Sequence, residues 1–293
     1  EYVATAKALG IYCNNGGFNT DNYKVITRTG MVNNHYLAFS GGTPQSNYRA
    51  SFGVMDHNTI IKKMDYNVFV AKVDVTQKAF NDRLTGEFGV FGSSFKNHDI
   101  FDTQMLFYSA ACQNPTFPAG TDEHGNWLKN ESATHINPPG ILLEEKNDSK
   151  DLNFDAHIKL SYDFNKNWRV STFGSYLYGS TENGQFCPTW VWAQGNVYRG
   201  EFKKEEWLGN VSLDFNKEFG IHKVSAGVSS EYRKLRKTAF WVYAKGIPTN
   251  DFHYDNLGAT AARPYGGTES TYEDQSLASV MGSITYNLLD RYT

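Results

Sequence analysis

Segments in which apolar and polar residues alternate recur along this chain, and the connections between them are short and long in turn. Alternation with a period of two is typical of β-strands, because successive side chains of a strand point to opposite faces. Nine strands are predicted, over residues 35–43, 47–56, 66–78, 83–95, 152–164, 168–180, 202–217, 221–242 and 272–287. This order predicts an antiparallel meander, with tight turns at one end of the sheet and loops at the other.

The short connections consist mainly of residues that favour tight turns. They lie at Pro44-Gln45, Asn81-Asp82, Asn165 to Asn167 and Glu218 to Gly220, and the long ones lie near Asn58 and over 97–150, 181–201 and 244–271. Gly41-Gly42, at the end of the first strand, permits a bulged turn and needs no role in ligand binding. Short turns on one side and long loops on the other are typical of a sheet that crosses a bilayer.

The faces of the strands support this interpretation. One face of the fifth strand carries Phe154, Ala156, Ile158, Leu160 and Tyr162, whereas the residues between them are polar or charged. The strands around Val211 and Val280 have the same division. A soluble β-sandwich would also have one apolar face, directed into its core, so the pattern leaves two folds open.

The positions of the aromatic residues favour the membrane. Trp168 and Tyr178 are ten residues apart on one strand face. At roughly 3.3 Å per residue and a tilt of roughly 40° they differ in depth by about 25 Å, the height of an outer-membrane apolar band. The predicted fold is therefore all-β: part of an antiparallel up-and-down transmembrane β-barrel, with short periplasmic turns and long extracellular loops.

Composition excludes several other classes. The mean hydropathy is -0.52 and no run of about 18 apolar residues exists, which excludes a transmembrane helix. A net charge of -3 gives no reason to expect nucleic acid as a partner. Cys13, Cys112 and Cys187 have no zinc-ligand spacing, so no metal is predicted; a Cys112–Cys187 bridge between two loops is possible.

The two ends of the chain predict a piece of a larger protein. Residues 1–33 are a poorly patterned lead-in, in which residues 2–9 form a short helix, and residues 34–293 form a partial barrel. Nine strands is an odd number, whereas bacterial single-chain barrels have even numbers. We therefore expect the chain to be an internal piece of a longer one.

The first hairpin also resembles a known family. Arg28-Thr29-Gly30, the run from Asn34 to Thr43 and the run from Ser46 to Gly53 are similar to the start of the barrel in SusC/RagA-type TonB-dependent outer-membrane transporters. The loop with Asn114 to Pro118, Asp122, Gly125-Asn126 and Asn137-Pro138 is similar to the large loop after the fourth strand in that family, and 286–292 resembles its mid-barrel turn.

This resemblance implies a function and partners. It implies a larger outer-membrane barrel with a plug, energised by TonB through the N-terminal part, covered by a SusD-like surface lipoprotein and importing oligosaccharides or peptides. Outer-membrane lipid would surround the barrel. Two alternatives remain at this stage: a soluble all-β carbohydrate-binding module, and a scaffold or adhesin-type surface protein without a solute path.

Loop aromatic residues are the candidates for contact with the substrate. Sugars offer C–H faces that stack on aromatic rings and hydroxyl groups that bond to polar side chains. The candidates in the long loops or at their rims are Trp190, Trp192, Trp127, Trp241 and Tyr243. Alternatively, these rings pack the loops against one another or against the plug and lid.

The remaining polar groups do not suggest an enzyme or a cofactor. No nucleophile elbow is present, because the run from Gly227 to Glu231 lacks its final glycine. The adjacent pairs Glu144-Glu145 and Glu205-Glu206 would point apart, and the sequence gives no sign that their pKa values are raised. The basic run from Arg233 to Lys237 suggests either attraction to anionic lipid or acidic substrate, or a solvated strand extension. Asp251, Asp255 and Asn256 are a weak signal for calcium.

Overall fold

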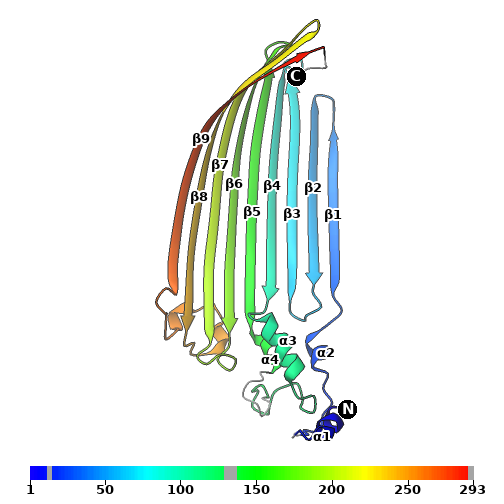
Figure 1. Cartoon of the computed structure of the whole chain (residues 1–293), viewed down its shortest axis with the longest axis vertical. Helices are drawn as coiled ribbons and strands as arrows, with labels where there is room; N and C mark the ends of the chain where they lie inside the picture. The colour runs from blue at the N-terminus through cyan, green and yellow to red at the C-terminus, as the bar shows by residue number, and fades with distance from the viewer. Residues whose placement is uncertain (12–14, 129–136, 290–293) are drawn as a thin grey trace.

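The computed structural model contains a single nine-stranded antiparallel sheet, in which every strand pairs with its neighbours in the sequence (Figure 1). The structure describes residues 1–11, 15–128 and 137–289. The strands are β1 (Met31–Gly42), β2 (Ser46–Asn58), β3 (Asp65–Ala79), β4 (Leu84–Asp99), β5 (Lys146–Asp163), β6 (Trp168–Cys187), β7 (Asn196–Phe219), β8 (His222–Lys245) and β9 (Thr268–Leu288). All nine predicted strands are confirmed, and β1 and β9 are the two edges of an open sheet.

The alternation of short and long connections is also confirmed. Tight turns join β1 to β2, β3 to β4, β5 to β6 and β7 to β8, all at one end of the sheet (Figure 1). In the first of these turns Gly42 has a φ of 148°, and a Cβ there would lie 2.2 Å from the carbonyl oxygen of Ser46. The predicted structural role of this glycine is therefore correct, because any side chain would collide with the turn.

The strands extend further toward the long loops than the sequence predicted, and β5, β6 and β7 do so most. β5 begins at Lys146, β6 ends at Cys187 and β7 begins at Asn196, so the loop between β6 and β7 spans only residues 188–195. Cys187 pairs directly with Asn196 across this loop. At the loop these extensions are buried on both faces, as Phe186 and Cys187 on β6 and Asn196 and Val197 on β7 show, and this weakens the period-two signal on which the sequence prediction rested.

The two faces of the sheet differ in character. We call the face that carries Ile158, Val211 and Val280 the outer face, and the opposite face the inner face. These three side chains are 48%, 54% and 76% exposed, and no second layer packs on them in the described part of the chain. The β-sandwich alternative is therefore wrong, because its apolar face would be buried in a two-layer core.

Within residues 1–11, 15–128 and 137–289, helices occur only at the long-loop end and in the lead-in. They are α1 (Tyr2–Ala8), α2 (Asn22–Ile26), α3 (Thr103–Cys112) and α4 (Pro138–Glu144), with 3-10 turns η1 (Asn250–Phe252) and η2 (Leu257–Ala259). α1 confirms the short helix predicted near the start of the chain. No helix in the described ranges has the length and apolar character needed to cross a membrane.

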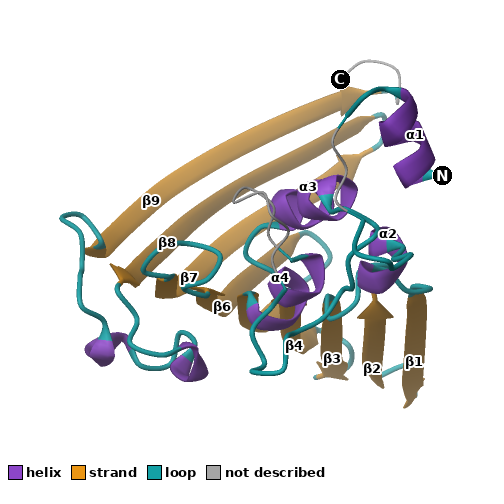
Figure 2. Cartoon of the chain, turned by 90° about the horizontal axis from the view of Figure 1, so that it is seen from below, coloured by secondary structure: helices purple, strands orange, loops and turns teal. Residues whose placement is uncertain are grey.

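Two small cores form at the long-loop end, one on each side of the sheet. Figure 2 shows α2, α3 and α4 on one side of the strand ends and the two 3-10 turns on the other. The helices bury a cluster that we call the helical core: Ile26, Ile61, Ile100, Leu106, Ala110, Ile141 and Leu142. Tyr254 and Leu257, from the loop between β8 and β9, pack on the second cluster: Phe186, Val197, Ala244 and Ile247.

Candidate functional site

Two of the five candidate aromatic residues lie together at the end of α4. The indole nitrogen of Trp190 donates a hydrogen bond of 2.6 Å to Glu144 Oε2, and that of Trp127 donates to Glu144 Oε1. The two ring centroids are 6.3 Å apart. Because both indole N–H groups bond to one internal carboxylate, these rings join the loops 100–145 and 188–195. Packing between loops was the alternative that the sequence left open for these residues.

Local sequence explains how α4 presents Glu144 to the two rings. Asn137 caps the helix, since its side chain accepts from the backbone nitrogen of Gly140 at 3.2 Å, and Pro138 follows at the first helical position. Gly140 then lies directly beneath the rings. A Cβ there would lie 2.5 Å from Trp190 and 2.8 Å from Trp127, so only glycine lets the two indoles approach the helix.

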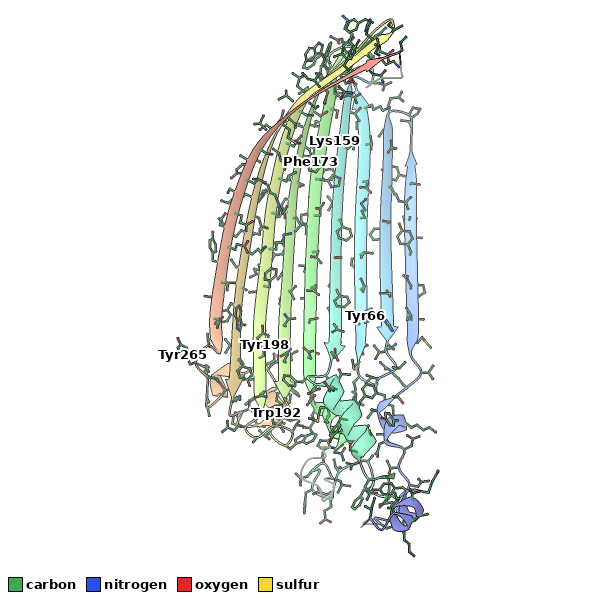
Figure 3. All side chains as sticks on the ribbon, viewed as in Figure 1. Tyr66, Lys159, Phe173, Trp192, Tyr198 and Tyr265 are labelled. Atoms are coloured by element: carbon green, nitrogen blue, oxygen red, sulfur yellow. The ribbon has the colours of Figure 1, made fainter. Side chains whose placement is uncertain are left out.

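The other three candidates lie apart from this pair. Trp192 is 47% exposed on the turn that follows Pro188 (Figure 3). Trp241 and Tyr243 belong to β8 itself and share the inner face, where the Tyr243 hydroxyl donates to Asn196 Oδ1 at 2.9 Å. The structure therefore divides the five candidates into a packed pair, an exposed loop tryptophan and two rings at the rim of the inner face.

Glu145 is a buried titratable residue at this end of the sheet that was not among the candidates from the sequence. Its side chain is buried, Oε2 accepts from the backbone nitrogen of Asp102 at 3.1 Å, and the Cys187 thiol donates to Oε1 at 3.6 Å. Burial raises the pKa of Glu145 to about 7. The expectation that neither member of the Glu144-Glu145 pair has a raised pKa is therefore wrong. Burial of the loop is the main cause of the raised pKa, the Asp102 carboxylate adds to it, and no local sequence signal reveals that burial.

The cysteines form no disulfide in the described part of the chain. Cys112 and Cys187 are both free thiols, so the possible bridge between them is not present, and Cys13 lies outside the described residues. Burial and the nearby Glu145 carboxylate raise the pKa of the Cys187 thiol, which makes it unreactive. Among the described residues, no group of three or more His, Cys, Asp or Glu side chains could hold a metal ion.

The basic run on β8 divides between the two faces. On the inner face, Arg233 bonds to Glu206 at 2.6 Å, and Lys237 also has an acidic partner there, Glu273, at 3.1 Å. On the outer face, Lys234 and Arg236 lie 3.7 and 3.5 Å from Asp274. Each of the four cations thus has an acidic partner, which is typical of a strand extension in water.

Comparisons with known proteins agree with this architecture. The chain is 26% identical to the TonB-dependent receptor P3 of Formosa agariphila and 25% identical to the TonB-dependent receptor SusC of Bacteroides thetaiotaomicron. Each match covers 94% of this chain, and the chain spans only 29% of the length of either relative. No family model matches the chain.

Solved structures show the same fold. A chain of the RagAB peptide importer in its open-open state superposes with a TM-score of 0.73 at 13% identity, over 92% of this chain and 31% of that one. The ferric citrate transporter FecA superposes with a TM-score of 0.54 at 7% identity, over 88% of this chain and 33% of that one.

The sheet is an open meander with an apolar outer face, and both its sequence and its fold match TonB-dependent receptors. These observations define the class: part of the β-barrel of a TonB-dependent receptor of the bacterial outer membrane. Within that class the chain is similar to the SusC/RagA type, and it spans about 30% of the length of those proteins. The resemblance seen in the first hairpin is confirmed. The family is one of transporters and not of enzymes, as the sequence predicted.

Proposed function

We propose that the protein to which this barrel segment belongs imports nutrients, oligosaccharides or peptides, across the outer membrane. TonB would supply the energy through an N-terminal plug, and a SusD-like lipoprotein would cover the long loops. The residues before β1 would then be the lead-in from that plug. The similarity to SusC and to a peptide importer supports a transport function for the whole protein. The experiment below distinguishes the two substrate classes.

The observation that carries this proposal is the contrast between the two faces of the sheet. Lys159 and Glu87 lie 3.7 Å apart on the inner face, while Ile158, the next residue to Lys159, lies on the outer face. A polar interior and an apolar exterior suit a barrel that encloses water and contacts lipid. An adhesin or scaffold barrel needs no polar path, so the charged inner face favours passage of a solute.

Trp241 and Tyr243 are the strongest candidates for contact with that solute. They lie at the long-loop end of the inner face, where a solute that enters from outside would first meet the wall. The Lys245 ammonium lies 5.6 Å from the ring centroid of Tyr243, so a cation and a π-face adjoin at this rim. Trp192, which is exposed on the neighbouring turn, would act beside them, whereas Trp127 and Trp190 would act indirectly by holding the loops.

Uptake by whole cells tests the proposal. The native gene would be deleted, and labelled oligosaccharides and peptides would be supplied to the deletion strain and to strains complemented with variants. We expect the deletion to abolish uptake of one class. A W241A/Y243A double variant should raise the half-saturating concentration about threefold to tenfold, since each lost stacking contact is small.

W207A is the matched control. Trp207 lies on the outer face, so its loss removes a similar ring without touching the inner wall. Unchanged uptake of both classes in the deletion strain would refute import. Equal effects of W207A and of the double variant would refute the assignment of the rim aromatic residues while leaving import intact.

A further inference from the structure

Two lysines face each other on the outer face with no acidic partner. Lys96 of β4 and Lys150 of β5 are direct partners in the strand register. Like charges opposite each other destabilise a strand pair. Across the described residues neither lysine side chain forms an ion pair or a hydrogen bond, although Glu182 lies opposite Lys150 on the next strand. This arrangement contrasts with Lys234 and Arg236, which share Asp274.

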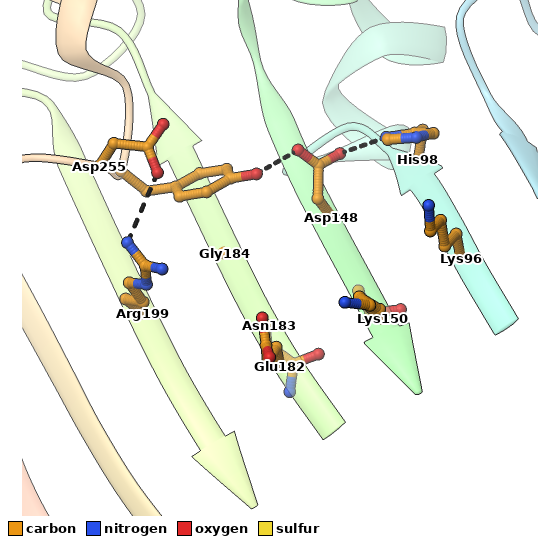
Figure 4. Close-up of a pocket in the computed structure, with 11 residues that line it drawn as sticks. Lys96, His98, Asp148, Lys150, Glu182, Asn183, Gly184, Arg199 and Asp255 are labelled. Carbon is orange, nitrogen blue, oxygen red and sulfur yellow. Dashed lines mark hydrogen bonds and ion pairs between the residues drawn. The ribbon is translucent and has the colours of Figure 1, made fainter. Parts of the chain in front are cut away.

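The lysine pair lines a pocket whose other polar groups are already engaged. Asp148 accepts from the Tyr254 hydroxyl at 2.6 Å and lies 3.0 Å from His98 Nδ1, and Arg199 lies 3.5 Å from Asp255 (Figure 4). The Tyr254 ring forms one wall, seated on Gly184, where a Cβ would lie 2.5 Å from it. The groups left to meet a ligand are the two ammonium groups of Lys96 and Lys150 and the Glu182 carboxylate.

The position of this pocket indicates what it meets. Along the outer face of β5, Lys150 is followed by Leu152, Phe154, Ala156 and Ile158. Lys150 is two residues from Leu152, the first apolar residue of this face, so at roughly 3.3 Å per residue and a tilt of roughly 40° it lies about 5 Å beyond the start of the apolar face. That is the depth at which headgroups lie above the hydrocarbon core.

A second feature of the same face suits the acyl chain of a lipid. Gly174 of β6 pairs directly with Gly209 of β7, and together they floor a shallow apolar recess rimmed by Ile158, Tyr176 and Trp207. A Cβ on Gly209 would meet no atom within 4 Å, so the recess is open and a side chain could fill it. A free phosphate ion has no apolar part that could occupy such a recess.

We propose that Lys96 and Lys150 bind the phosphate of an anionic lipid of the outer leaflet, whose acyl chains run along β5 toward the Gly174–Gly209 recess. The ligand relieves the repulsion between the two ammonium groups, and the Glu182 carboxylate accepts a hydrogen bond from a hydroxyl group of the headgroup. This inference rests on the outer-membrane placement of the sheet and is independent of the transported substrate.

Native mass spectrometry of the full-length protein tests the site. The detergent-purified protein would be titrated with phosphatidylglycerol, and with phosphatidylcholine as the lipid without net charge. In a K96Q/K150Q variant we expect the apparent dissociation constant for phosphatidylglycerol to rise about thirtyfold, because each lysine near an anionic surface contributes roughly fivefold. K203Q/K234Q is the matched control, since it removes two outer-face charges that already have acidic partners, Glu201 and Asp274.

The other variants separate the sources of the phosphate. G209V fills the recess and should weaken binding of phosphatidylglycerol while leaving binding of inorganic phosphate unchanged. K96E should abolish lipid binding and raise the melting temperature of the lipid-free protein, because it replaces the repulsive pair with Lys150 by an attractive one and has the neutral Asn67 opposite it on β3. Equal losses in the two double lysine variants would overturn the proposal. So would displacement of phosphatidylglycerol by inorganic phosphate at comparable concentration, which would reassign the pocket to a free anion.

Discussion

The outer face of the sheet and the helical core use the same residue types in opposite ways. Ile158 on β5 is 48% exposed, whereas Ile141 on α4 is 0% exposed, beneath α2 and α3. In the helical core, apolar side chains leave water by contact with one another. On the outer face the sheet offers them no protein partner, so they need lipid as their surroundings.

Apolar residues therefore stabilise the helical core and the outer face by different mechanisms. Packing complementarity governs the helical core, where a lost methylene leaves a cavity. Transfer to hydrocarbon governs the outer face, where shape matters little and charge matters greatly. Substitutions in each region should therefore fail in distinct ways, and the following four predictions test that separation.

The largest effect is expected for L106A in the helical core. Leu106 on α3 is fully buried, and a Leu-to-Ala change in such a site costs about 2–5 kcal/mol. L160A on the outer face of β5 should cost much less, because lipid can fill the space that the side chain leaves. Hydrogen exchange of the α3 amides in the full-length protein measures the first effect, and refolding in vesicles measures the second. Comparable losses in both assays would mean that the two regions do not differ.

The next effect is expected for V211R at the centre of the outer face. An arginine near the midplane of a transmembrane barrel costs about 2–4 kcal/mol, because its charge must leave water. S212R, one residue further along, directs the same side chain to the polar inner face and should be close to neutral. Urea titration of refolding into lipid vesicles compares the two variants. A similar loss for S212R would show that the inner face is not wet.

The sheet was predictable from sequence because its signal is local and repeated. Alternation around Ile158, Val211 and Val280 and the turn residues between strands required no knowledge of distant contacts. The strand extensions near Cys187 and Asn196 were not predicted. The loops pack against these strand ends, so their residues do not alternate between an apolar and a polar face. These segments are strands because they hydrogen-bond to the neighbouring strands along their whole length.

The candidate site was much less predictable, because it depends on contacts between segments far apart in the chain. Trp127 and Trp190 could be singled out as loop aromatic residues, but their shared partner Glu144 could not. Glu145 acquires its raised pKa through burial in the folded loop, where Cys187 and Asp102 lie against it. No spacing in the sequence brings these residues together. The inner-face positions of Trp241 and Tyr243 followed from strand parity once β8 was known to reach Lys245.

A smaller, pH-dependent effect is expected at Glu145. Its pKa is about 7 in the folded protein and about 4.3 when unfolded, so the folded loop binds the proton more tightly. Stability of the loop should therefore be highest below the unfolded pKa, fall as the pH rises toward 7, and stay level above it. The full difference is about 4 kcal/mol as an upper bound, and water that reaches the opened loop reduces it. Hydrogen exchange of the Asp102 and Met105 amides, corrected for intrinsic rate, measures this profile, which E145Q should flatten. An unchanged profile in E145Q would assign it to another group.

The smallest effect is expected for G140A, which adds one methyl group beneath the two indoles. The new Cβ would lie 2.5 Å from Trp190 and 2.8 Å from Trp127, so the rings must move away and weaken their bonds to Glu144. Overpacking of this kind costs about 1–3 kcal/mol. G209A, where the new methyl meets open space on the outer face, is the matched control and should be neutral. Limited proteolysis of the 100–145 loop in the full-length protein measures the opening. Equal cleavage of G140A and G209A would show that Glu144 and its two tryptophans do not hold the long loops together.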